Sequence, residues 1–288
     1  MSYPSPRRIA ITAHPELLHA EAEAIRIATH LETLGVETTW AFLGDEGFNQ
    51  RVTKGNYNLL IALGGDGTML RAGHLCAPIG LPILGINMGR FGFLMEFRHE
   101  RWKEMVSVLL SGDYWLERRM MLTAELWRGE ECLGTWEVLN EVVVSRGQFV
   151  RPIHLQAIVD NRLLTTYVAD GLIAATPTGS TAYALAAGGP ILPPELRNIL
   201  LVAVAPHLSL DRAIVLAEGS SVSILTHTDH EAVFSVDGQK PITLTDGDRV
   251  NAHASEHTVQ FVRFQDPGYF YRNLTPHMNQ NPSLEKKR

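Results

Sequence analysis

The chain has 288 residues, of which 45% are hydrophobic and 19% charged, and its formal net charge is −6 at pH 7. This composition is typical of a globular protein with one large or two ordinary domains, and the negative balance argues against a general nucleic-acid-binding surface. No apolar run reaches the roughly 18 residues that span a bilayer, and the two cysteines, Cys76 and Cys132, lack metal-ligand spacing. We therefore expect a cytoplasmic protein with reduced thiols and with no membrane or nucleic-acid partner.

The first part of the chain alternates predicted strands with predicted helices. Apolar residues between 17 and 34 recur at steps of three and four, which indicates one face of an amphipathic helix. Strands alternating with helices predict an α/β fold with a parallel sheet covered on both sides, and ligands bind such sheets beyond the carboxyl ends of the strands. We predict strands at residues 8–13, 37–42, 57–63 and 81–86, and helices at 17–34, 68–76 and 102–110.

Beyond about residue 118 the pattern becomes mostly β, which predicts a second domain of layered sheets. Asp160-Asn161 and Asp237-Gly238 have the composition of hairpin turns. The predicted strands lie within 121–144, with a break at 128–131, and at 154–159, 163–168, 200–204, 221–225, 232–236 and 257–264.

A glycine-rich loop, Gly64-Gly65-Asp66-Gly67-Thr68, joins the apolar third strand to a helix start. Backbone N–H groups at such a junction can hold a phosphate, and glycine lets the backbone approach it closely. A carboxylate repels phosphate, so Asp66 makes chemical sense as a proton acceptor for an attacking hydroxyl or as a metal ligand. The alternative is a plain strand–turn–helix corner in which Asp66 is a turn or capping residue.

Two stretches of the β-rich part also carry candidate binding residues. In Asn140-Glu141 the amide suits the edge of a base and the carboxylate suits a pair of ribose hydroxyls, although an exposed strand end would have the same composition. In the segment 176–183 a strand breaks at Pro177 and Gly179, and a helix is predicted from Thr181 to Ala187. Its N-terminus could face a ligand, or the segment could be a corner with ordinary hydroxyl capping.

Three arginines are candidate phosphate contacts. Arg71 lies one turn along the helix that follows the glycine loop, Arg151 follows the Asn140-Glu141 strand, and Arg90 suits either a phosphate or a surface ion pair. The sequence has no Walker A loop, no GxGxxG and no evident Ser/His/Asp or zinc-ligand pattern.

The order of these motifs closely resembles the bacterial NAD kinases over residues 8–274. The segment Thr176-Pro177-Thr178-Gly179-Ser180-Thr181-Ala182-Tyr183 is the most specific part, whereas the GGDGT loop is shared with lipid kinases and is similar to one in phosphofructokinases. The resemblance implies a phosphofructokinase-like α/β nucleotide-binding domain at 1–118, to which 265–288 returns, and a β-rich, sandwich-like NAD-binding domain at 119–264.

The resemblance further implies the reaction. The γ-phosphoryl group of ATP, bound with Mg²⁺, would be transferred to the 2′-hydroxyl of the adenosine ribose of NAD to give NADP. The partners would be these small molecules, and the assembly a homodimer or homotetramer.

The resemblance also assigns roles to residues. Asp66 would be the proton acceptor, Asn140 would contact the adenine, Glu141 the ribose and Asp170 the nicotinamide end. The phosphate loop would be Gly64, Gly65, Gly67 and Thr68, and the further substrate-binding positions would be Arg71, Arg151, Thr181, Ala182, Tyr183, Ala184, Leu185, Ala186, Ala205 and Gln239.

Two other functions would also fit parts of this sequence. The first is a lipid kinase with a similar loop, against which the net negative charge and the absence of a basic amphipathic helix weigh. The second is a non-catalytic sensor of NAD or NADP, which the intact loop around Asp66 disfavours only mildly.

Overall fold

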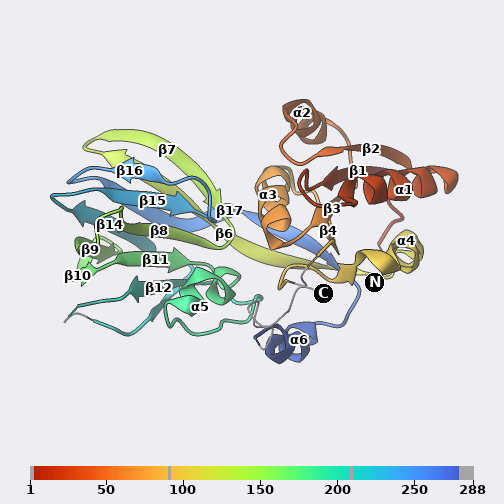
Figure 1. The fold of residues 1–288 in the computed structure, drawn as a ribbon. Coiled ribbons are helices and arrows are strands. Elements are labelled where there is room, and N and C mark those ends of the chain that lie inside the picture. Colours follow the sequence, from red (N-terminus) through yellow and green to blue (C-terminus); the bar gives the residue numbers. More distant parts are fainter. Residues whose placement is uncertain (1–2, 90–91, 208–209, 279–288) are drawn as a thin grey trace. The chain divides into compact units, whose positions relative to one another are not determined.

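The computed structural model describes residues 3–89, 92–207 and 210–278, and the chain divides into two compact units. Unit 1 consists of Met1–Arg118 and Val259–Arg288, and unit 2 of Arg119–Thr258. Two strands, β6 (Trp115–Arg128) and β17 (Arg249–Arg263), run from one unit into the other along the chain (Figure 1). Unit 1 is therefore built from two stretches that lie far apart in the sequence.

The sheet of unit 1 is parallel, as predicted. Its strand order is β2-β1-β3-β4, followed by the end of β17, where Phe261 pairs with Ile83. The central strand β3 is buried along its whole length, which explains its continuous apolar sequence. The bounds are β1 (Arg8–Ala13), β2 (Glu37–Phe42), β3 (Leu59–Gly64), β4 (Ile83–Asn87) and the short β5 (Phe97–Arg98), which pairs with β4.

Helices cover both faces of this sheet. Helices α1 and α4 share a core with Ile11, Ile61 and other residues of one face, whereas Met69 of α3 packs against Gly85 on the opposite face. Helix α2 was not predicted, because only Phe48 and Val52 of its residues are buried. The helices are α1 (Ala20–Thr33), α2 (Glu46–Lys54), α3 (Asp66–Cys76), α4 (Trp102–Ser111) and α6 (Tyr269–Met278), with 3-10 turns η1 (Ala77–Ile79) and η2 (His99–Arg101).

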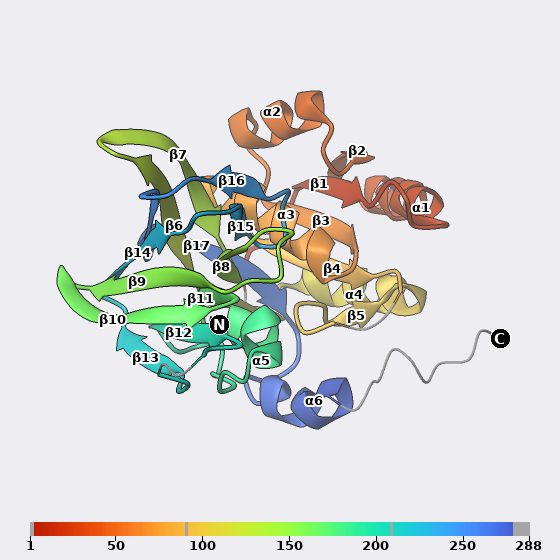
Figure 2. The same cartoon turned by 60° about the vertical axis from the view of Figure 1, so that its left-hand side comes forward.

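Unit 2 consists of two antiparallel layers, which confirms the predicted β-rich, sandwich-like domain (Figure 2). One layer has the order β10-β9-β14-β17, in which β6 pairs with β17 and β7 pairs with β6, and the other has the order β13-β12-β11-β8-β15-β16. Residues of both layers, among them Leu122, Val144 and Ile224, form one hydrophobic core. The remaining bounds are β7 (Glu131–Val138), β8 (Glu141–Arg146), β9 (Ile153–Val159), β10 (Arg162–Ala169), β11 (Gly171–Ala175), β12 (Asn198–Val204), β13 (Ile214–Ala217), β14 (Ser221–His227), β15 (Ala232–Val236) and β16 (Ile242–Leu244).

The helix predicted over 181–187 is wrong in extent. The chain forms a 3-10 turn, η3 (Gly179–Thr181), and then a helix of only four residues, α5 (Tyr183–Ala186). Ala182 between them has a non-helical backbone, and the Ser180 hydroxyl ties the turn to Pro177 and Leu192 instead. A helix this short supplies no N-terminal anion site.

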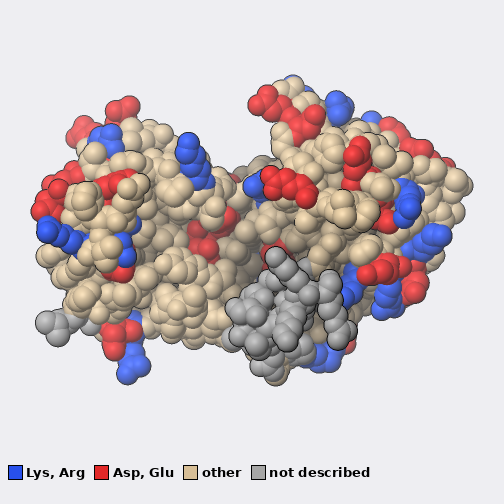
Figure 3. Space-filling view, in the orientation of Figure 1, with Lys and Arg blue, Asp and Glu red and all other residues tan. Residues whose placement is uncertain are grey.

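The surface is mixed in charge. On the face shown in Figure 3, acidic and basic side chains are interspersed over the described residues of each unit. Among the helices in the described part of the chain, none is long and apolar enough to cross a membrane.

Candidate active site

The glycine loop of unit 1 is fixed by its own threonine. Strand β3 ends at Gly64, Gly65 is the N-cap and α3 begins at Asp66. The buried Thr68 accepts a hydrogen bond from Gly65 N at 3.4 Å and donates its own N–H to Gly65 O at 2.9 Å. A Cβ at Gly64 would lie 2.0 Å from Thr68 Oγ1, so this position requires glycine. A Cβ at the exposed Gly67 would meet no atom within 4 Å, which leaves room beside this residue.

Asp66 is held by a second segment that follows β4. Its Oδ2 accepts the N–H of Phe93 at 2.9 Å, and its Oδ1 accepts the N–H of Leu94 at 3.1 Å. A Cβ at Gly92 would lie 2.2 to 2.4 Å from the carboxylate atoms, so only glycine fits beneath Asp66. The sequence alone did not link these two segments, and Arg90, just before the second, lies outside the described residues.

In unit 2 one carboxylate orders the Asn140-Glu141 segment. Asp237 accepts the N–H groups of Leu139 and Asn140 at 2.7 Å and that of Glu141 at 2.9 Å. Asp237 has a positive φ of 47°, in the turn after β15. The sequence indicates only a turn at Asp237, not its contacts with this segment.

The segment 176–183 lies directly beside Asn140-Glu141. Thr176 donates its N–H to Asn140 O at 2.9 Å and its hydroxyl to Leu139 O. A Cβ at Gly179 would lie 2.1 Å from Asn140 O, so the two segments are in close backbone contact. The structure thus brings together the two stretches of the second half that the sequence singled out.

Glu141 has a strongly raised pKa. It is buried, and burial together with the nearby charge of Asp237 raises its pKa to about 8, although the N–H of Tyr183 favours the charged form. Among the described residues none forms a hydrogen bond with Glu141 Oε2, which is also buried. A buried oxygen in this situation is suited to accept a hydrogen bond from a ligand hydroxyl.

Comparison with known proteins identifies the family. The ATP-NAD kinase N-terminal domain matches residues 20–114, and the ATP-NAD kinase C-terminal domain matches residues 139–264. An NAD kinase of Chloroflexus aurantiacus is 38% identical over 275 residues, which cover 95% of this chain and 99% of the relative. The chain belongs to the NAD kinase family. The family that the sequence motifs resembled is thereby confirmed.

Solved structures of NAD kinase relatives agree with the fold. The crystal structure of an NAD kinase from Archaeoglobus fulgidus in complex with ATP matches with a TM-score of 0.75 and 26% identity, over 94% of this chain and 98% of that chain. The crystal structure of yeast NADH kinase complexed with NADH matches with a TM-score of 0.84 and 24% identity, over 99% of this chain and 91% of that chain. At this identity the match shows a similar fold.

The remaining residues expected from the NAD kinase pattern lie in several environments. Asp170 forms an ion pair with Arg146 at 3.0 Å, and Ala205 has a positive φ of 46°. Arg151 lines a hollow of about 400 Å³ with His154, His227 and His230. Arg71, Tyr183, Ala186, Ala205 and Gln239 are exposed, Thr181, Ala182 and Leu185 half-buried, and Ala184 buried.

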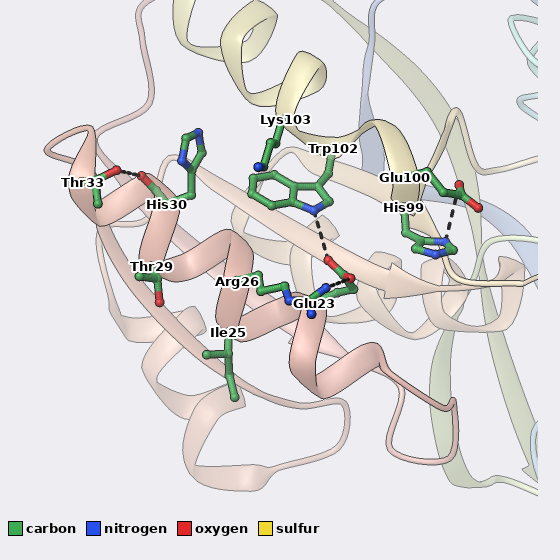
Figure 4. A pocket seen from close by; sticks show the side chains of 10 residues that line it. All are labelled: Glu23, Ile25, Arg26, Thr29, His30, Thr33, His99, Glu100, Trp102 and Lys103. Carbon is green, nitrogen blue, oxygen red and sulfur yellow. Dashed lines mark hydrogen bonds and ion pairs between the residues drawn. The ribbon is translucent and has the colours of Figure 1, made fainter.

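A hollow of about 740 Å³ in unit 1 contains none of the residues expected from the NAD kinase pattern (Figure 4). It lies between α1 and the start of α4, where Trp102 Nε1 donates to Glu23 Oε2 at 3.0 Å and Arg26 pairs with the same carboxylate at 2.8 Å. Within the described residues, no group of three or more His, Cys, Asp or Glu side chains could hold a metal ion.

Proposed function

We infer that this chain transfers the γ-phosphoryl group of ATP to the 2′-hydroxyl of the adenosine ribose of NAD, giving NADP and ADP. The observation that carries this assignment is the match of both NAD kinase domains in one chain, at residues 20–114 and 139–264. A lipid kinase that shared only the GGDGT loop would not account for the match of the second domain.

Asp66 is our proposed proton acceptor. The 2′-oxygen attacks the γ-phosphorus, its proton passes to the Asp66 carboxylate, and the bond from the γ-phosphorus to the bridging oxygen breaks to release ADP. The two backbone N–H groups on Asp66 support this role, because they fix the carboxylate beside the glycine loop. Gly64, Gly65, Gly67 and Thr68 form the proposed phosphate loop at the start of α3.

Asn140 and Glu141 are our proposed contacts for the adenosine of NAD. The buried Oε2 of Glu141 supports a contact with a ribose hydroxyl, because a hydroxyl donor would satisfy it. The proposed substrate pocket further includes Arg71, Arg151, Asp170, Thr181, Ala182, Tyr183, Ala184, Leu185, Ala186, Ala205 and Gln239.

Magnesium belongs in this proposal to the ATP substrate. Mg²⁺ in kinases is held largely by phosphate oxygens and water, with one or two carboxylates, so it does not need a dedicated cluster of protein ligands. We assign it no protein ligand. We further propose a cytoplasmic homodimer or homotetramer, on the resemblance to bacterial NAD kinases.

One assay separates the proposed reaction from its rivals. Purified protein is incubated with NAD, ATP and Mg²⁺, and NADP is measured with an NADP-specific dehydrogenase, with a parallel reaction that offers a diacylglycerol or sphingoid lipid. NADP formation is the expected result. Binding of NAD without turnover would instead identify a sensor, and phosphorylation of lipid alone would identify a lipid kinase.

A further inference from the structure

A buried ionic cluster in unit 1 lies at the end of β17. The guanidinium of Arg263 is only 1% exposed, and its Nε lies 2.9 Å from Glu117 Oε2. Tyr269 donates its hydroxyl to the same carboxylate at 2.9 Å, and Glu96 Oε2 lies 3.9 Å from Arg263 Nη1. Both carboxylates are buried as well.

Burying such a cluster costs free energy. Removing charges from water is expensive, and buried ion pairs contribute little net stability compared with apolar side chains of similar volume. Burial acts to lower the pKa of Arg263, but Glu117, Tyr269 and Glu96 together outweigh it, so the pKa is raised and the guanidinium stays charged. Burial raises the pKa of Glu96, against the attraction of Arg263. Stability alone is therefore a weak reason for the cluster.

The cluster is connected to Asp66 through one residue. Arg263 Nη1 donates to the carbonyl oxygen of Leu94 at 3.0 Å, while the N–H of Leu94 donates to Asp66 Oδ1 at 3.1 Å. Leu94 is thus held on one side by the guanidinium and on the other by the carboxylate.

A second acid fastens the same segment to the end of β17. Glu96 Oε1 accepts the N–H groups of Phe264 at 2.9 Å and Gln265 at 2.7 Å. At the other end of the segment, the lack of a side chain at Gly92 lets the chain pass directly beneath Asp66. The segment 92–96 therefore has little freedom to move while the cluster is intact.

We propose that Arg263 is a positioning residue for Asp66, acting through Leu94 to hold the carboxylate where it accepts the proton of the ribose hydroxyl. This inference rests on the proposed role of Asp66. Because misplacement of a reacting group by about 1 Å can cost roughly 100-fold in rate, loosening the segment is expected to lower kcat and to leave substrate binding nearly intact.

The test is a double-mutant cycle with Arg263→Lys and Asp66→Asn. Lysine keeps the positive charge but lacks the planar fork that reaches Glu117 and Leu94 together. In the wild-type background we expect Arg263→Lys to lower kcat by about 10- to 100-fold and to change KM for NAD and ATP by less than about threefold. In the Asp66→Asn background it is expected to lower the residual kcat by less than about twofold, because the acceptor it positions is gone.

Two further variants keep the test decisive. Tyr269→Phe removes only the hydroxyl that holds Glu117, and it should show the same dependence on Asp66 with a smaller loss of kcat, even if Arg263→Lys does not fold. Glu23→Gln is the matched control, because it alters another buried carboxylate of unit 1, whose partners are Trp102 Nε1 and Arg26 on the two helices α1 and α4. Its kcat should stay within about twofold of wild type, even where its loss of unfolding free energy is as large as that of the Arg263 or Tyr269 variant.

The outcomes distinguish this inference from the proposed function. The positioning role would be overturned if the Arg263 and Tyr269 variants lowered kcat by the same factor with and without Asp66. It would also be overturned if they raised KM and left kcat unchanged. Normal turnover in Asp66→Asn would instead remove Asp66 as the acceptor, and an inactive wild-type protein would refute the reaction itself.

Discussion

Two carboxylates, Asp66 in unit 1 and Glu141 in unit 2, lie in different environments that give the same chemical group different properties. Asp66 is half-buried, and each of its oxygens accepts a backbone N–H. Glu141 is buried, lies near a second acid and has a pKa raised to about 8. For Asp66 the surroundings fix position, which suits the proposed proton acceptor. For Glu141 they raise the pKa and leave Oε2 without a hydrogen-bond partner among the described residues, which suits the proposed contact with a ribose hydroxyl.

The largest expected effect comes from Asp66→Asn. The variant should lose at least roughly 100-fold in kcat, since general-base assistance typically contributes about 10²–10⁴-fold. Binding of NAD, measured by calorimetry, should persist. The new amide also places an NH₂ group against the N–H of Phe93 or Leu94, so the segment 92–94 will shift as well. A near-normal kcat would exclude Asp66 as the acceptor.

Gly92→Ala should produce the next largest loss. Its Cβ would lie 2.2 Å from Asp66 Oδ1, so the carboxylate has to move, and we expect kcat to fall by roughly 10- to 100-fold. Gly67→Ala is the comparison, since its Cβ meets no protein atom within 4 Å. The Gly67 variant should fold normally and lose activity only through KM for the substrates. Equal kcat losses in the two variants would contradict the idea that Gly92 makes room for Asp66.

Asp237→Ala should chiefly affect unit 2. Three N–H groups, from Leu139 to Glu141, would lose their acceptor, and we expect unfolding in urea to show a loss of about 1–3 kcal/mol. Affinity for NAD should fall in parallel. Asp229→Ala is the matched control, because its side chain is 91% exposed and the change should stay within about 0.5 kcal/mol. Similar stabilities of the two variants would argue against Asp237 as the organiser of this segment.

The smallest effect is a pH dependence of stability that arises from Glu141. Its pKa rises from 4.5 to about 8 on folding, so between these values the folded state keeps a proton that the unfolded state has lost. The stability of the wild type should therefore fall relative to Glu141→Gln as pH rises, by about 1 kcal/mol from pH 6 to pH 7, and should level off above pH 8. A difference that does not change with pH would show that Glu141 is already ionised in the folded protein.

Much of the fold could be predicted because the signal was local. The apolar runs of β1 and β3 and the helical periodicity of α1 lie within single windows of sequence. Helix α2 was missed because it buries so few side chains. The first part of β17 was missed because its buried side chains are small or polar: Val250, Ala252 and Ser255. The helix predicted over 181–187 is longer than the four-residue α5, because Ser180 is hydrogen-bonded to Leu192. The periodicity of the sequence does not reveal this contact.

The candidate site, like the fold, could be predicted only where the signal lay within one stretch of sequence. Asp66 and Asn140-Glu141 could be selected from residue chemistry and motif order. The groups that hold them could not, since Phe93 and Leu94 lie 27 and 28 residues from Asp66, and Asp237 lies 96 residues from Glu141. For the contacts of Asp66 the signal in the sequence was the glycine at position 92, which only the folded chain explains. For Asp237 the signal was the predicted turn at Asp237-Gly238.

The discontinuous make-up of unit 1 has a consequence for synthesis. Its sheet includes the end of β17, and Arg263, Phe264 and Tyr269 come from the last part of the chain. During translation the glycine loop emerges early, whereas the guanidinium and amides that contact the segment 92–96 emerge only after all of unit 2 has been made. Unit 1 therefore cannot reach its complete structure first, and a ribosome-bound fragment that stops before Val259 would carry Asp66 without the anchor of its neighbouring segment.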